Sequence, residues 1–176
     1  MQENARLSDV LAGCRDGDSE SFSQLVDMYS GRCYGYFYRL TGNRGISEDL
    51  LSELFARVVE KIGSFKGAYF DGWLFKVASN IFHDYLRSNL RRGRFLERQQ
   101  SLLTEQASAE PPYEGEKTDE LQKRLFELDD ETRELIMLRF YSQLSFKEIA
   151  KMRSEPIGTT LSKVHRGLKK LRDLME

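Results

Sequence analysis

Long segments of this chain repeat their apolar residues at the spacing of an α-helix, and none alternates them as a half-buried strand does. Within residues 20–40 the repeat consists of Phe22, Leu25, Val26, Tyr29, Cys33, Phe37 and Leu40. We predict a helix over 20–40 with Ser19 as its N-cap, ended by Gly42 and Asn43. A shorter helix is expected over 8–15. The pattern predicts an all-α fold.

Two further amphipathic segments follow in the N-terminal half. The first is predicted to start at Ser47, whose side chain can cap it, with Glu48 and Asp49 in the first turn, where the helix dipole favours carboxylates. Gly63 is expected to end it, and after a loop over 64–70 a third helix runs from about 71 to 92. Amphipathic helices joined by short loops predict a helical bundle over residues 1–95.

The periodicity fades between residues 96 and 118. This segment contains Pro111 and Pro112 beside the glutamates Glu110, Glu114 and Glu116, and residues 96–120 carry a net charge of −5. Such a composition predicts a flexible acidic linker. Positive segments lie on both sides of it, with net +4 over 63–95 and +3 over 121–176. Two separate contacts with a polyanion are therefore expected.

Four short helices are predicted in the C-terminal part, at about 119–127, 130–142, 146–153 and 156–175. Ser145 and Glu148 form a capping box at the start of the third. The last two helices are joined by a tight turn, which is how a helix-turn-helix places its second helix in a DNA major groove. On that helix we expect an inner face made of Ile157, Leu161, Val164, Leu168 and Leu171. The outward face then carries hydroxyl and basic side chains that suit phosphates and base edges.

Several classes of protein are disfavoured by what the sequence lacks. Cys14 and Cys33 are too few for a disulfide framework, and His83 and His165 lie on different predicted helices. No nucleophile–base pair or metal cluster is suggested, so neither an enzyme nor a cofactor is expected. No apolar run approaches the ~18 residues of a membrane span, and no secretory signal is visible. A cytoplasmic protein without membrane insertion is expected.

Three motif groups together carry a family resemblance. They are Ser47-Glu48-Asp49-Leu50 with Glu53-Leu54-Phe55, Trp73 to Asn80 with Asp84-Tyr85-Leu86-Arg87, and Leu144 to Ala150 followed by Pro156-Ile157-Gly158-Thr159. In this order and spacing, over about residues 16–175, the chain resembles bacterial RNA polymerase sigma factors of the extracytoplasmic-function (ECF) group. The resemblance implies a region 2 helical domain over 1–95, a linker over 96–118 and a region 4 helix-turn-helix domain over 119–176.

The same resemblance implies a function. Such a protein binds core RNA polymerase, directs it to specific promoters and promotes strand opening. In the family the second long helix docks on the clamp of the polymerase, which implies contacts by Asp49, Leu50, Glu53 and Phe55. From periodicity alone, Asp49 would only serve the helix N-terminus and Phe55 would be core. Ser52 stands where the family usually has Gln.

Region 2 of the family also binds the −10 promoter element as a single strand. The residues that this assigns are Lys66, Tyr69 and Phe70 in the loop and Lys76, Asn80, Asp84, Arg87 and Arg91 on the third helix. Aromatic faces and cations suit unstacked bases and their phosphates. The alternative is that Tyr69, Phe70 and Trp73 are core residues and that Asn80 and Asp84 form a solvated face.

Region 4 of the family reads the −35 element as duplex DNA. The corresponding residues are Thr159, Thr160, Ser162, Lys163, Arg166 and Lys169. This chain departs from the family at the turn, where Ser154 replaces Gly and Arg153 replaces an apolar residue. Thr160 stands where the family often has Val and can point inward, and Leu161 replaces a common Lys.

The expected partners are core RNA polymerase, promoter DNA in duplex and single-stranded form, and an anti-sigma factor that covers the polymerase-binding surfaces. The acidic linker would follow the RNA exit path of the polymerase, or would serve only as a tether. A stand-alone helix-turn-helix regulator is the alternative, and it explains residues 121–176 equally well. It gives no reason for the face of Asn80, Asp84 and Arg87.

Overall fold

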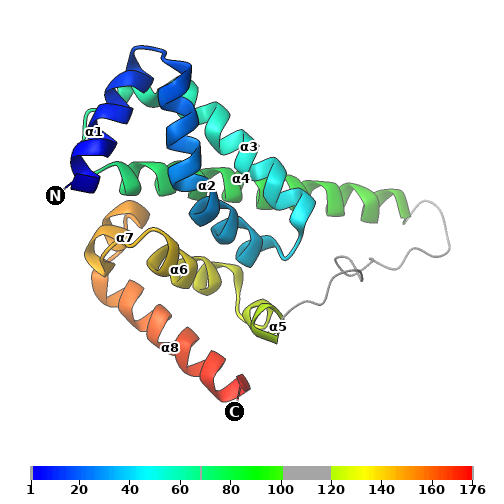
Figure 1. The fold of residues 1–176 in the computed structure, drawn as a ribbon. Coiled ribbons are helices and arrows are strands. Elements are labelled where there is room, and N and C mark those ends of the chain that lie inside the picture. Colours follow the sequence, from blue (N-terminus) through cyan, green and yellow to red (C-terminus); the bar gives the residue numbers. More distant parts are fainter. Residues whose placement is uncertain (1, 68, 101–119, 176) are drawn as a thin grey trace.

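The computed structural model describes residues 2–67, 69–100 and 120–175 (Figure 1). In this described part the chain forms only helices, as the sequence predicts. The first group comprises α1 (Gln2–Arg15), α2 (Ser19–Thr41), α3 (Arg44–Lys61), the short 3₁₀-helix η1 (Ile62–Ser64) and α4 (Phe70–Gln100). The second group comprises α5 (Glu120–Phe126), α6 (Asp130–Tyr141), α7 (Phe146–Arg153) and α8 (Ile157–Met175).

Two helix starts differ from the prediction because another side chain caps the helix. The cap of α2 is Asp18, whose carboxylate accepts from the Ser21 backbone N–H at 2.8 Å, so Ser19 is the first helical residue. Asn43 caps α3 in the same way, since its Oδ1 accepts from Ile46 N–H at 2.9 Å. Helix α3 therefore begins about one turn before Ser47, and Ser47 is a buried residue within the helix. No carboxylate lies in the first turn of α3.

The core of the first group is built around large aromatic side chains. Tyr36, Phe37, Phe75 and Phe82 are all almost completely buried. The Tyr36 and Phe75 rings meet edge to face, with centroids 5.5 Å apart. Such pairs add about 0.5–1.5 kcal/mol to the free energy gained from burial alone. This core joins α2 to α4 and fixes the direction of α4.

Helix α4 starts at Phe70 and continues to Gln100, past its expected end near 92. The first residues of the predicted linker, 96–100, are therefore helical. Residues 101–119, where the rest of that linker is predicted, lie outside the described residues.

The C-terminal helices confirm the helix-turn-helix prediction. Ser145 caps α7 through the capping box with Glu148, in which both reciprocal hydrogen bonds are present. The turn after α7 depends on Ser154, which adopts a left-handed conformation (φ 55°, ψ 40°) and caps the C-terminus of that helix. Ser154 therefore performs in the turn the role for which glycine is the usual residue.

The predicted inner face of α8 is only partly right. Val164 and Leu171 are buried, whereas the exposed fractions of Ile157, Leu161 and Leu168 are 46%, 42% and 47%. The buried side of α8 is completed by the small residues Thr160 and Gly167. A Cβ atom on Gly167 would lie 2.5 Å from the Thr132 methyl group, so glycine lets α6 and α8 approach closely. Part of the predicted inner face of α8 therefore lies at the surface.

The two groups of helices are packed against each other, with α2 alongside α6 and α4 beside α7 (Figure 1). The Arg32 side chain of α2 donates through Nε to the Tyr141 backbone carbonyl at 2.9 Å. Gln122 of α5 donates to the Arg39 carbonyl at 3.1 Å. The sequence predicted two helical modules but gave no indication that they contact each other.

Candidate polymerase and nucleic-acid interfaces

Some of the candidate polymerase-binding residues lie on the exposed side of α3, and others lie on its buried side. Asp49 and Glu53 are exposed, while Leu50 is 5% exposed and Phe55 is half-buried against the core. The prediction that Leu50 contacts a partner does not fit this structure, because Leu50 lies on the same face of α3 as the buried Leu54 and Val58. The apolar side chain of Val59 on α3 is 54% exposed. Val59 thus adds an apolar side chain to the solvent-exposed residues of α3.

The loop before α4 presents one aromatic ring and one cation. Lys66 is exposed and Tyr69 is 44% exposed. Phe70 is only 2% exposed, and its ring packs edge to face on Tyr29 with centroids 5.2 Å apart. The prediction that Phe70 stacks on a DNA base is therefore wrong, because this ring anchors the first turn of α4 in the core. Trp73 is half-buried beside Phe70.

A pocket of about 360 Å³ opens beside Tyr69. Its other walls include Leu7, Leu11 and Arg15 of α1 and the ring of Phe65. Arg15 donates to the Phe65 backbone carbonyl at 3.3 Å, which ties α1 to the loop. The contribution of α1 was missed from the sequence, because a short amphipathic helix gives no sign of which loop it will cover.

The residues of α4 that we predict to bind the −10 element share one polar face of the helix. Lys76, Asn80, Arg87 and Arg91 are exposed on it. Asp84 is paired with Arg87 on its own helix and with Arg57 of α3 at 3.5 Å. A hydrogen bond from Arg87 lowers the pKa of Asp84, with Arg57 adding to the effect. Asp84 is therefore held ionised and can only accept hydrogen bonds, as from an exposed base amino group.

The outward face of α8 carries exposed Ser162, Arg166 and Lys169, while Thr159 is half-buried. Thr160 does not belong to this face. It is fully buried, and its hydroxyl donates to the Glu155 carboxylate at 2.6 Å.

Lys163 is directed toward acidic neighbours. Its Nζ lies 2.8 Å from Glu131 and 2.9 Å from Glu155, and hydrogen bonds to these carboxylates raise the pKa of Lys163. The side chain is 21% exposed. The charge of Lys163 is therefore largely compensated within the protein, which leaves Arg166 and Lys169 as the cations of this face that are directed to solvent.

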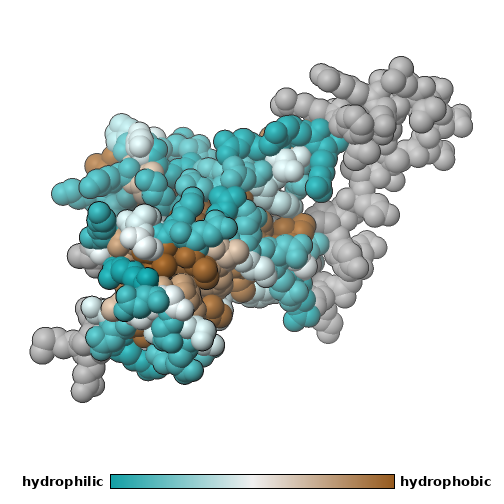
Figure 2. All heavy atoms as spheres, turned by 90° about the horizontal axis from the view of Figure 1, so that it is seen from above, coloured by the Kyte–Doolittle hydropathy of each residue, from teal (hydrophilic) through white to brown (hydrophobic). Residues whose placement is uncertain are grey.

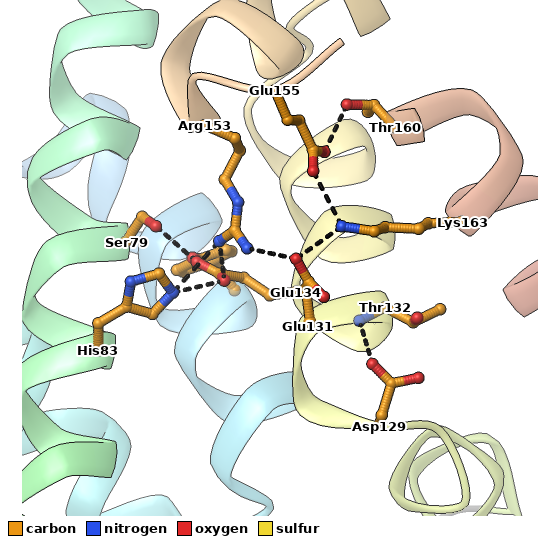
Figure 3. Close-up of polar contacts among 11 residues, drawn as sticks. Ser79, His83, Asp129, Glu131, Thr132, Glu134, Arg153, Glu155, Thr160 and Lys163 are labelled. Atoms are coloured by element: carbon orange, nitrogen blue, oxygen red, sulfur yellow. Dashed lines mark hydrogen bonds and ion pairs between the residues drawn. The ribbon is translucent and has the colours of Figure 1, made fainter. Parts of the chain in front are cut away.

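A buried polar cluster connects the two groups of helices (Figure 3). At its centre is the carboxylate of Glu134 on α6, 1% exposed. It accepts from the Ser79 hydroxyl at 2.5 Å, the Tyr36 hydroxyl at 3.1 Å and Arg153 Nη1 at 2.6 Å, and it lies 2.7 Å from His83 Nε2. The one sequence signal for this cluster is Arg153, a charged residue where the resemblance leads us to expect an apolar one.

Burial of the Glu134 carboxylate would by itself raise its pKa. Hydrogen bonds from His83 and Ser79 and the charge of Arg153 outweigh burial, and the pKa lies below its ordinary value of 4.5. Glu134 is therefore an ionised group that is fully partnered by both groups of helices. A buried carboxylate of this kind is stable only while its partners remain in place.

Two kinds of structural feature are absent from the described part of the chain. Among those residues, no three His, Cys, Asp or Glu side chains come together as a metal ion would require. None of the helices there is both long and apolar enough to cross a membrane.

The surface of one face is mainly hydrophilic, with hydrophobic residues gathered near its middle (Figure 2).

Comparison with known proteins identifies both helical groups. The sigma-70 region 2 family model matches residues 25–92, and the sigma-70 region 4 model matches residues 124–173. The ECF sigma factor SigE of Mycolicibacterium smegmatis is 33% identical over 163 residues, covering 88% of this chain and 62% of SigE. The ECF sigma factor SigW of Bacillus subtilis is 29% identical over 175 residues, covering 91% of this chain and 94% of SigW.

The fold agrees with this assignment. The sigma factor RpoE from Bartonella quintana, in its complex with the anti-sigma factor NepR, superposes with a TM-score of 0.70 at 25% sequence identity. The match covers 89% of this chain and 97% of RpoE. The chain belongs to the sigma-70 family, in its ECF group.

Proposed function

We propose that this chain binds core RNA polymerase, directs it to specific promoters and promotes strand opening. The observation that carries the proposal is the distribution of three chemically different surfaces over the two sigma-70 regions. These are the carboxylate face of α3, the pocket and polar face of α4, and the cationic face of α8. Residues 1–95 would form region 2, and residues 119–176 would form region 4.

The surface of α3 suits a basic partner helix. Asp49 and Glu53 would give charge complementarity, and the exposed Val59 would give apolar contact. We assign this surface to the polymerase.

Single-stranded −10 DNA would bind along Lys66, Tyr69, Lys76, Asn80, Asp84, Arg87 and Arg91. The pocket beside Tyr69 has room for one unstacked base, for which the ring offers a stacking surface. Flipping a base costs a few kcal/mol, and stacking on an aromatic ring returns about 1–3 kcal/mol per base. The protein needs no catalytic step of its own, because preferential binding to the separated strand shifts the equilibrium toward open DNA.

Duplex −35 DNA would bind along α8 through Thr159, Ser162, Arg166 and Lys169. Exposed cations hold phosphates and hydroxyl groups reach base edges, as for other helices of this kind in the major groove.

An anti-sigma factor is a further proposed partner. RpoE of Bartonella quintana is in complex with such a protein, NepR, and the likeness to RpoE extends over both regions.

The test is reconstitution. The purified chain is mixed with core RNA polymerase and examined for co-elution and for transcription from a promoter template. A sigma factor co-elutes and makes transcription promoter-dependent. A stand-alone helix-turn-helix regulator binds duplex DNA without polymerase and leaves core transcription unspecific, which would contradict the proposal.

A further inference from the structure

We infer that Arg57 of α3 is a positioning residue for −10 recognition, which holds the Asp84 carboxylate of α4 in the orientation that reads a base amino group. Arg57 itself contacts no base and acts through Asp84. The inference rests on the proposed function, because it gives a role in −10 binding to a residue outside the −10 surface. The spacing of residues on α4 does not indicate Arg57, since Arg57 belongs to another helix.

The Asp84 carboxylate is held from two helices. Its Oδ2 atom lies 3.5 Å from Arg57 Nη2 on α3, and its Oδ1 atom accepts from Arg87, one turn further along α4. The two helices pack against each other. The terminal torsion of an aspartate is broad when nothing holds it. Because each Asp84 oxygen has its own arginine, this rotation is restricted.

Of the two arginines, Arg57 is the more firmly placed. The same Nη2 atom lies 2.5 Å from Glu53, one turn earlier on α3, and the Arg57 side chain is 30% exposed. The Arg87 side chain is 67% exposed. Arg87 is therefore free to turn to a phosphate when DNA binds, while Arg57 stays beside Asp84. The orientation of Asp84 in the DNA-bound form then depends on Arg57.

The charge of Arg57 also makes Asp84 compatible with DNA. A carboxylate without a nearby cation on this surface would be repelled by the phosphates of the strand. With Arg87 engaged by a phosphate, Arg57 is the cation that compensates Asp84. The Asp84 oxygens keep further lone pairs, so they can still accept a hydrogen bond from a base amino group.

A role of Arg57 in folding alone is the alternative that a test must separate. Ion pairs between side chains this exposed contribute little to the free energy of unfolding. Loss of Arg57 should therefore leave stability in urea almost unchanged and should alter the discrimination between bases. Discrimination is a quantity that a purely structural role would not change at one base position only.

The test uses the full chain bound to core RNA polymerase, with single-stranded −10 oligonucleotides from the promoter of the reconstitution. At each position in turn, a base with an exocyclic amino group is replaced by its counterpart without one. Purine replaces adenine, hypoxanthine replaces guanine and uracil replaces cytosine. The ratio of the two dissociation constants is the discrimination at that position. The position at which Asp84→Ala loses discrimination is the one that Asp84 reads.

The variants of Arg57 are compared at that position. We expect Arg57→Gln to lower discrimination about tenfold, the size of one well-placed base contact. Adding Arg57→Gln to Asp84→Ala should cause no further loss, because the two residues act as a unit. Arg57→Lys keeps a positive charge and should retain most of the discrimination. Lys61→Gln removes one positive charge from an exposed position at the end of the same helix, and should change nothing.

Several results would overturn the inference. They are an Arg57→Gln discrimination equal to that of Lys61→Gln, a further loss in the double variant, a loss in Arg57→Lys as large as in Arg57→Gln, and an Asp84→Ala variant that loses discrimination nowhere. A fall in core polymerase affinity, or an equal fall in discrimination at every position, would also overturn it, since Arg57 would then serve the polymerase surface or the fold. If the parent chain binds no core polymerase or prefers no base, the proposed function fails instead.

Discussion

The Glu134 carboxylate of α6 and the Ser79 hydroxyl of α4 lie 2.5 Å apart, although 55 positions separate them in the sequence. This hydrogen bond joins the two regions of the sigma factor at a fully buried point. Tyr36, His83 and Arg153 complete the set of groups around the carboxylate, from α2, α4 and α7 respectively. The state of this one carboxylate therefore affects how firmly the two regions are held together.

The closed form, in which the two regions pack against each other, should depend on pH in the acidic range. The pKa of Glu134 is below 4.5 when its partners surround it and should return toward 4.5 when the regions separate. A depressed pKa stabilises the closed form above the ordinary value, and this contribution is lost as the pH falls through the lowered pKa. The distance between fluorescent labels attached to Asp27→Cys on α2 and Asp173→Cys on α8, both at exposed positions, should therefore lengthen as the pH falls below about 4.5. Energy transfer between the labels measures this distance.

Glu134→Gln is the control for that titration, since it cannot ionise. Other carboxylates also protonate in this range, so the informative quantity is the difference between the parent and Glu134→Gln profiles. Profiles that coincide in shape would show that the Glu134 carboxylate does not govern closure.

The turn of the helix-turn-helix offers a stability prediction. Ser154 has a φ of 55°, a left-handed conformation that costs an L-residue about 1–2 kcal/mol and glycine very little. Part of the gain from glycine is offset by its greater freedom in the unfolded chain. We expect Ser154→Gly to raise the free energy of unfolding by about 1 kcal/mol, measured by urea denaturation. Ser154→Ala keeps the strained conformation and should give no gain.

The sequence predicted the helices well because their apolar spacing is regular over many turns. It placed the starts of α2 and α3 incorrectly because Asp18, Ser19, Asn43 and Ser47 are all competent caps, and only the path of the chain decides between them. Leu50, expected at an interface, is buried because it shares a helical face with the buried Leu54 and Val58.

The −10 and −35 surfaces could be predicted only in part. The spacing of residues within one helix does not show which distant side chains will form ion pairs with them. Lys163 is compensated by Glu131, 32 positions away, and Glu155. The contact between the regions depends on Tyr36, Ser79 and Glu134, which no periodicity links. Only Arg153, a charged residue where the family resemblance leads us to expect an apolar one, indicated this contact in the sequence.

Arg166 and Lys163 should differ in their contributions to duplex binding. Arg166 is exposed, whereas Lys163 is already paired with two carboxylates. In a binding assay on −35 duplex DNA, Arg166→Ala should weaken binding and reduce the slope of log K against log salt by about 1. Lys163→Ala should change that slope less, and should lower the free energy of unfolding by about 0.5–1 kcal/mol. Equal salt slopes for the two variants would contradict this assignment.

Asn80 should act in strand opening and not in polymerase binding. It is exposed on the polar face of α4 and is not one of the α3 residues that we assign to the polymerase. Loss of one hydrogen bond to a base edge is worth about 1–1.5 kcal/mol, or roughly tenfold in the equilibrium between closed and open DNA. We expect Asn80→Ala to lower open-complex formation by about that factor, measured with a fluorescent base in the non-template strand, while affinity for core polymerase is unchanged.

Asn89→Ala provides the matched control for Asn80→Ala. Asn89 is an exposed asparagine of the same helix, and nine positions at 100° per residue place it on the opposite side from Asn80. Its substitution removes the same amide from α4 and should leave both strand opening and polymerase affinity unchanged. If Asn89→Ala slows opening as much as Asn80→Ala does, the effect belongs to the helix as a whole. If Asn80→Ala lowers polymerase affinity and opening together, the −10 assignment of this face fails.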